Sequence, residues 1–109
     1  MDIYFANQEV KRLCLVEREA KKRLGPPSAK KLRARLADLA AARQLDELVA
    51  GRPHPLKGER AGQFAVSLHG GARLVFEAAD EPPVVTPDGA TDWHRVRSIR
   101  IVFVGDYHD

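Results

Sequence analysis

The sequence predicts an α+β fold in which an N-terminal helical hairpin packs on a small antiparallel β-sheet. Two observations lead to this prediction: apolar residues recur at helical spacing between residues 7 and 51, and beyond Gly51 they alternate with polar residues. With 109 residues, the chain is long enough for one hydrophobic core and too short for two. We therefore expect residues 1–109 to form a single domain that carries one functional site.

The first expected element is a short edge strand, DIYFA at residues 2–6, and a helix follows from Asn7. This helix should end at GPPS, residues 25–28, because proline cannot donate the next backbone hydrogen bond. Leu15 is out of phase with the apolar stripe of the helix, which consists of Val10, Leu13, Cys14, Ala20 and Leu24.

A second helix is expected to follow Ser28, whose hydroxyl suits an N-cap. Its apolar stripe consists of Leu32, Leu36 and Leu39, and one more helical turn closes at Gly51. Because only a tight turn separates the two helices, we expect them to form an antiparallel hairpin.

Beyond Gly51, the alternating pattern predicts three strands. The turn sequence HGG, residues 69–71, separates the first two strands, and a segment rich in proline and acidic residues, 79–93, precedes the last. Arg73 and Arg100 then project from the open face of the sheet, which we define as the face that points away from the helices. The residues expected to face the helices are Phe64, Val66, Leu68, Leu74, Phe76, Ile99, Ile101 and Phe103.

The net charge is only +3, but the cations are concentrated in residues 11–35, where Glu17 and Glu19 are the only acidic residues. Such a segment suits binding to a phosphate backbone, and it also suits the solvated face of ordinary helices. Composition does not choose between these interpretations. The candidate nucleic-acid-binding residues are Lys21, Lys22, Arg23, Lys30, Lys31 and Arg35.

The single cysteine, Cys14, has no partner for an internal disulfide and is expected to be a small core residue. The sequence also contains neither a signal-peptide pattern nor an apolar run of membrane-spanning length. These features predict a cytoplasmic location without a membrane partner.

The stretch RPHPLKGERAGQ, residues 52–63, is the first candidate site. Its two prolines restrict the backbone around His54, while Lys57 and Arg60 are candidates for binding a phosphate. Taken alone, such a loop is more often a plain connector with solvated cations.

Residues distant in the sequence complete a set that suits RNA cleavage. Without a metal ion, this reaction needs a base for the 2′-hydroxyl proton, cations for the charge on phosphorus and an acid for the 5′-oxygen. Histidine suits either proton-transfer role because its pKa lies near neutrality. The candidate catalytic residues are His54, Lys57, Arg73, Tyr107 and His108, supported by Asp106, Arg60 and Arg100.

Other kinds of site have little support. Cys14 and the histidines lack the spacings typical of zinc sites, and there is no glycine-rich nucleotide-binding motif and no GxSxG motif. We therefore predict no metal and no cofactor. Trp93 is expected to serve packing or a partner contact, and His69 and His94 are expected at the surface.

The segments HPLKGERAGQFAV, ARLVFE and the terminal DYH, in this order, resemble the HigB-like toxins of the RelE/ParE superfamily, the toxic halves of bacterial type II toxin–antitoxin pairs. The resemblance spans nearly the whole chain. It implies a RelE-like fold, ribosome-dependent cleavage of mRNA in the A site of the 70S ribosome, and a cognate helix-turn-helix, HigA-like antitoxin.

The resemblance also implies roles for particular residues. His54 and His108 would transfer protons, Lys57 and Arg73 would contact the phosphate, Tyr107 would stack on a base, and Asp106 would orient a neighbour. Which histidine is the acid and which the base stays open. The basic helices would meet ribosomal RNA.

Two departures from the family pattern are a longer segment at residues 79–96 and Ala72, where an aromatic residue often precedes the strand arginine. Two alternatives to the ribonuclease also stay open. One is a toxin of the same fold that poisons DNA gyrase, and the other is a non-catalytic nucleic-acid-binding regulatory subunit.

Overall fold

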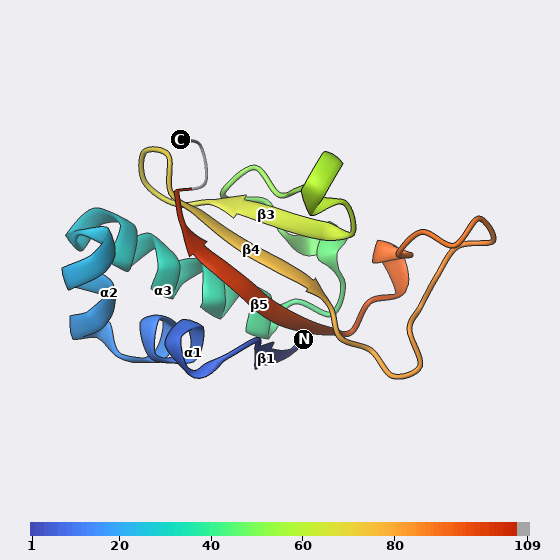
Figure 1. Cartoon of the computed structure of the whole chain (residues 1–109), viewed down its shortest axis with the longest axis horizontal. Helices are drawn as coiled ribbons and strands as arrows, with labels where there is room; N and C mark the ends of the chain where they lie inside the picture. Colours follow the sequence, from blue (N-terminus) through green and yellow to red (C-terminus); the bar gives the residue numbers. More distant parts are fainter. Residues whose placement is uncertain (107–109) are drawn as a thin grey trace.

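The computed structural model describes residues 1–106, which form three α-helices and a five-stranded mixed sheet (Figure 1). An α+β fold is therefore confirmed. The helices are α1 (Gln8–Leu15), α2 (Glu17–Leu24) and α3 (Pro26–Ala41). The strands are β1 (Asp2–Phe5), β2 (His54–Pro55), β3 (Gln63–Ser67), β4 (Arg73–Ala78) and β5 (Ser98–Gly105). Three short 3-10 helices lie at η1 (Leu45–Glu47), η2 (Gly58–Arg60) and η3 (Trp93–Arg95).

The segment predicted as one helix from Asn7 forms two helices. Asn7 caps α1, where its Oδ1 accepts a hydrogen bond from the Val10 amide at 2.9 Å. The break is at Val16, a β-branched residue with extended backbone angles (φ −109°, ψ 104°). This residue turns the chain so that α2 lies along α3. The out-of-phase Leu15, just before the break, is 61% exposed.

The start of α3 also differs from the prediction. Gly25 (φ +86°) is the N-cap residue, and Pro26 and Pro27 occupy the first helical positions, where a missing N–H costs nothing. Ser28 is therefore inside the helix and does not cap it. Its side chain is buried, and its hydroxyl donates a hydrogen bond to the His69 carbonyl at 3.3 Å.

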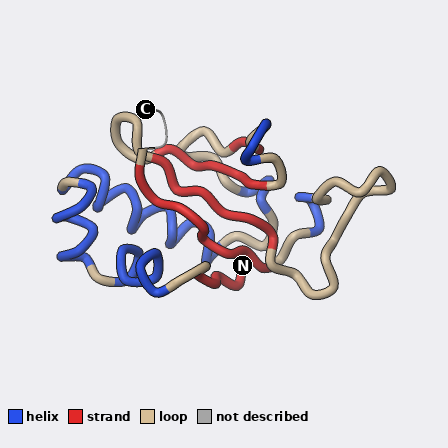
Figure 2. Tube along the Cα trace, viewed as in Figure 1, coloured by secondary structure: helices blue, strands red, loops and turns tan. Residues whose placement is uncertain are grey.

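The sheet has the strand order β1-β5-β4-β3-β2 and appears as one continuous layer in Figure 2. Strands β3 to β5 pair antiparallel, as predicted. The short strand β2, which was predicted as a loop, pairs antiparallel to β3. Strand β1 pairs parallel to β5, so the expectation of an antiparallel sheet was wrong for this strand. Alternating apolar residues predict that a strand exists. The direction of its neighbour is decided by the path of the chain, which here passes through the helices before it returns.

The predicted core face is confirmed up to a bulge in β5. Phe76 pairs with Ile101, whereas Val75 pairs with Phe103, so one extra residue lies on β5 between these pairs. The bulge reverses the alternation, so Phe103 lies on the open face and the prediction that it faces the helices was wrong. Its place in the core is taken by Val104, which packs against the buried cluster. The other residues predicted to face the helices are buried.

The long segment between β4 and β5 projects from the body of the molecule and is anchored at its base (Figure 1). The Asp80 carboxylate accepts hydrogen bonds from the Arg97 and Ser98 amides at 3.1–3.2 Å. Near the end of the segment, the Trp93 ring packs edge-on against Phe64, with ring centroids 5.0 Å apart. Trp93 is thus a packing residue. None of the helices that the structure describes is long and apolar enough to cross a membrane.

Candidate functional site

Strand pairing arranges the side chains of the open face in rows across the sheet, and three of these rows concern the candidate site. Paired residues point to the same face, and successive rows lie two residues, roughly 7 Å, apart along a strand. The first row holds Ser67, Arg73 and Gly105; the second holds His54, Ala65, Val75 and Phe103; the third holds Gln63, Glu77, Arg100 and Tyr4. The register thus places His54, Arg73 and Arg100 on one face.

His54 lies on the short edge strand β2, directly opposite Ala65, and its side chain is exposed. Its Nδ1 lies 2.7 Å from the Arg52 carbonyl oxygen. A carbonyl only accepts hydrogen bonds, so Nδ1 carries the proton and the neutral ring leaves Nε2 as its basic atom. The backbone between Pro53 and Pro55 thus presents an imidazole with a defined basic nitrogen.

The two cations of the adjoining loop have different surroundings. Lys57 is exposed just before η2, where its ammonium is accessible to a phosphate. The Arg60 guanidinium lies 5.0 Å from the centroid of the Phe103 ring and donates a hydrogen bond to the Gln63 side chain at 3.0 Å. Lys57 suits substrate binding, whereas Arg60 holds the loop against the sheet.

Arg73 begins β4 at the turn that connects it to β3. Its Nη1 donates hydrogen bonds to the carbonyls of Gly70 at 3.3 Å and Ala72 at 3.0 Å. Opposite Arg73, β5 ends at Gly105, and Asp106 then packs against Gly71, where a Cβ atom would collide with the carboxylate. Asp106, the residue that follows β5, therefore meets the same turn as Arg73. Tyr107, His108 and Asp109 lie outside the described residues.

In the third row, Arg100 and Glu77 form a cross-strand ion pair. Arg100 Nη1 lies 2.6 Å from Glu77 Oε2, and the two side chains are 37% and 36% exposed. Neither Glu77 nor Gln63 is among the residues predicted for the site. Their alternation with the buried residues Phe76 and Phe64 was a usable signal, but Phe103 was not predictable because the bulge reverses its face.

The basic residues of the helices gather at the corner between α2 and α3, where Lys22, Lys30 and Lys31 are exposed. Two other cations are ion-paired: Lys21 with Glu17 at 3.2 Å and Arg23 with Glu9 at 3.0 Å. The hydrogen bond from Ser28 to His69 joins this corner to the turn between β3 and β4. The corner and Arg73 therefore lie at the same end of the molecule.

Arg35 differs from the other basic helical residues. Only 15% of its side chain is exposed, and its Nε donates a hydrogen bond to the Ser67 carbonyl at 3.3 Å. This geometry joins α3 to β3 and leaves little of the guanidinium for a ligand.

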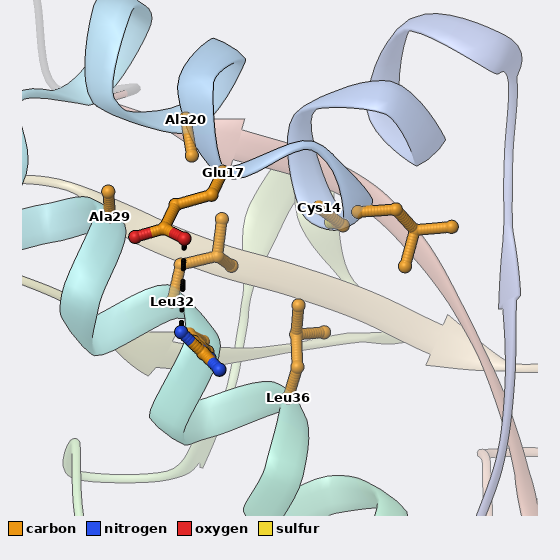
Figure 3. Close-up of a pocket in the computed structure, with 8 residues that line it drawn as sticks. Cys14, Glu17, Ala20, Ala29, Leu32 and Leu36 are labelled. Atoms are coloured by element: carbon orange, nitrogen blue, oxygen red, sulfur yellow. Dashed lines mark ion pairs between the residues drawn. The ribbon is translucent and has the colours of Figure 1, made fainter.

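Cys14 lies on the wall of a groove of about 410 Å³ between the helices (Figure 3). Burial raises the pKa of its thiol to about 12, so the thiol stays protonated near neutral pH and is a poor nucleophile. Glu17 and Arg33 form an ion pair across this groove at 3.9 Å. Among residues 1–106, no three His, Cys, Asp or Glu side chains gather to hold a metal ion.

The overall arrangement of helices and strands matches that of a solved toxin. A YoeB/ParE toxin from Agrobacterium tumefaciens superposes with a TM-score of 0.61, over 99% of this chain and 100% of that chain. The two proteins share a fold. Their sequence identity is 13%, so the likeness to the YoeB/ParE toxin is one of fold alone. No protein-family model and no curated protein sequence matches the chain significantly.

The fold shared with the YoeB/ParE toxin agrees with the RelE-like fold that the sequence resemblance implied. The narrower assignment to HigB-like toxins stays a prediction.

Proposed function

We propose that this protein is the toxin of a type II toxin–antitoxin pair and that it cleaves mRNA on the ribosome. The observation that carries the proposal is the orientation of His54, whose Nδ1–H is held by the Arg52 carbonyl so that Nε2 is the basic atom of the ring. His54 shares the open face with Arg73, and Lys57 follows three residues later. The shared fold with a YoeB/ParE toxin supports the toxin class.

In the proposed reaction, a histidine takes the proton of a 2′-hydroxyl, and the 2′-oxygen attacks the adjacent phosphorus atom. Lys57 and Arg73 stabilise the negative charge that develops on the phosphate oxygens. The bond from phosphorus to the 5′-oxygen then breaks, and an acid protonates this oxygen. The products are a 2′,3′-cyclic phosphate and a free 5′-hydroxyl.

His54 and His108 are the candidates for the two proton-transfer roles, Tyr107 for stacking on a base, and Asp106 for orienting a neighbour. Arg60 and Arg100 support this set, Arg60 through its contact with Phe103 and Arg100 through its ion pair with Glu77. The exposed corner residues Lys22, Lys30 and Lys31 suit the backbone of ribosomal RNA, because each phosphate contact releases counterions. Lys21 and Arg23 join them when their ion pairs open, whereas Arg35 contributes mainly to the fold.

Two partners follow from the proposal. One is the 70S ribosome with its mRNA, and the other is a cognate antitoxin of the helix-turn-helix, HigA-like type. The antitoxin is expected to suppress the growth arrest that this chain causes when it is produced alone.

The experiment that tests the proposal compares two histidine variants. The chain, His54→Ala and His94→Ala are each induced in bacteria, and mRNA 5′ ends are mapped across the transcriptome. His94 is a matched control because it is exposed and lies in η3, paired with Asp46 at 3.0 Å, away from the open face.

We expect wild type and His94→Ala to produce new mRNA 5′ ends within translated regions. His54→Ala should lower cleavage by about 10²- to 10⁴-fold, the usual contribution of a positioned acid or base. Unchanged mRNA ends on induction of wild type would refute the ribonuclease. If His54→Ala and His108→Ala were both fully toxic, gyrase poisoning would be favoured, and salt-sensitive RNA binding without cleavage would favour the regulatory subunit.

A further inference from the structure

A second cavity lies at the opposite end of the open face from Arg73. It has a volume of about 350 Å³ and lies between the third row of the sheet and the segment after β4. Its floor includes Gln63, Glu77 and Arg100, and its wall includes Pro83, Val84 and Val85. The cavity thus combines a polar floor with an apolar wall.

The wall of this cavity is held by several independent contacts. The Asp80 carboxylate fixes the start of the segment to the Arg97 and Ser98 amides. Farther along, the Asp92 amide donates to the Val84 carbonyl at 3.0 Å, and Val85 pairs with Thr91. The cavity is therefore formed before any ligand arrives, which lowers the entropy lost on binding.

The floor offers hydrogen-bond acceptors and donors side by side. The ion pair between Arg100 Nη1 and Glu77 Oε2 fixes both side chains. Within residues 1–106, Glu77 Oε1 and the Nε and Nη2 groups of Arg100 make no further hydrogen bond. A ligand that donates to Glu77 and accepts from Arg100 would satisfy both groups.

The charge of the cavity disfavours a phosphate. Glu77, Asp80 and Glu81 all line it, and Arg100 is the single cation among its lining residues. A nucleobase is neutral and flat, presents donors and acceptors on one edge, and can lay its face on Pro83, Val84 and Val85. Guanine fits best, because its N1–H and N2–H groups can both donate to one carboxylate while its O6 accepts from a guanidinium.

The position of the cavity relates it to the proposed reaction. Gln63 lies two residues from Ala65, the partner of His54, so the polar floor is one row, roughly 7 Å, from the histidine. Arg60 bridges the rows through Gln63 and Phe103. A phosphate at His54 therefore leaves an adjacent base within reach of the cavity.

We propose that this cavity binds a guanine base next to the cleaved bond and that Glu77 and Arg100 determine this specificity. The inference rests on the proposed ribonuclease function and deepens it. Guanine preference then arises because any other base leaves part of the Glu77–Arg100 floor without a hydrogen-bond partner.

The test measures cleavage on ribosome complexes whose mRNAs differ only in the nucleotide that flanks the cleaved bond. Wild type should cleave the guanine mRNA roughly tenfold or more faster than the adenine mRNA, as expected for one well-placed bidentate contact. Glu77→Gln, which keeps the shape of the side chain, should bring this ratio close to one. The control is Asp2→Asn, an exposed carboxylate outside the cavity, which should keep the wild-type ratio.

A second measurement separates this inference from the proposed function. Guanosine and adenosine are titrated into the full chain without ribosomes, and amide NMR signals of Val84, Val85 and Arg100 are followed. Guanosine should shift these signals in wild type but not in Glu77→Gln, whose fold is checked by its melting curve. Selective guanosine binding without any mRNA cleavage would overturn the ribonuclease and keep the base site.

Two results would overturn the base site itself. One is cleavage by wild type with no preference for guanine, or with a preference that Glu77→Gln retains. The other is the lack of selective guanosine shifts together with the lack of cleavage, which would overturn both proposals.

Discussion

Two glycines with nearly the same backbone angle allow the cost of a steric collision to be separated from the cost of backbone strain. Gly51 has φ +87° and Gly62 has φ +89°, a region that residues with a Cβ atom rarely adopt. A Cβ atom at Gly62 would meet no atom within 4 Å. At Gly51 it would collide with Val66 Cγ1, lie 2.7 Å from Arg35 Nε and lie 3.0 Å from the Ser67 carbonyl oxygen.

Alanine should therefore destabilise the protein more at Gly51 than at Gly62. Backbone strain costs about 1–3 kcal/mol at either position and largely cancels in the comparison. The collision at Gly51 adds about 1–3 kcal/mol, the usual cost of forcing a group into packed surroundings. The surroundings of Gly51 cannot easily move away from an added Cβ atom. Val66 is 2% exposed, and the Gly51 carbonyl accepts a hydrogen bond from the Ser67 amide at 2.6 Å.

Urea denaturation of wild type, Gly51→Ala and Gly62→Ala measures this difference in the free energy of unfolding. Gly51 precedes the loop that carries His54, so we also expect Gly51→Ala to lower mRNA cleavage more than Gly62→Ala does. Equal free energies of unfolding for the two variants, within about 0.5 kcal/mol, would refute the close packing of Gly51 against α3 and β3.

Three further predictions concern the stability of the fold and test Cys14, Leu32 and Arg35 in turn. Burial raises the pKa of the Cys14 thiol from 9.0 to about 12, so the folded state keeps the thiol proton to a higher pH than the unfolded state does. The free energy of unfolding should therefore fall by up to about 1.4 kcal/mol per pH unit between pH 9 and 12. Urea midpoints at pH 9 and 10.5 should show this fall in wild type but not in Cys14→Ala, and equal falls would contradict it. Leu32, only 1% exposed, should cost about 2–5 kcal/mol in calorimetry or urea melts when changed to alanine, and a cost below about 1 kcal/mol would contradict its place in the core. Arg35→Gln should lower the melting temperature more than Arg33→Gln, because Arg35 is 15% and Arg33 82% exposed, whereas similar melting curves would argue against the link from α3 to β3.

Local sequence patterns predicted much of the fold because they act over a few residues. Alternation identified strands β3, β4 and β5 and the buried side chains Phe64 and Phe76. Proline and glycine marked the turn between the second and third helices. The patterns failed where the outcome depends on distant residues. The break at Val16 and the parallel pairing of β1 with β5 are examples.

The candidate site was predictable only in part. Its charged residues are visible in the sequence, and the alternation in β4 correctly placed Arg73 on the open face. The sequence does not show which of the cations are accessible to a ligand. Arg35 and Lys31 look alike in the sequence, yet Arg35 is largely covered by its contact with β3 while Lys31 is exposed. The terminal residues Tyr107 and His108 stay a sequence prediction, because they lie outside the described part of the chain.

By itself, the sequence determined the α+β class, the buried face of the sheet up to the bulge, and the set of groups available for proton transfer and phosphate binding. These follow from residue type and spacing, which act locally. Only the tertiary structure decided that Phe103 turns to the open face beneath Arg60, and that Glu77 and Arg100 pair beside a cavity. Register, bulges and contacts between distant segments are fixed by the packing of the whole chain, and no short stretch of sequence encodes them.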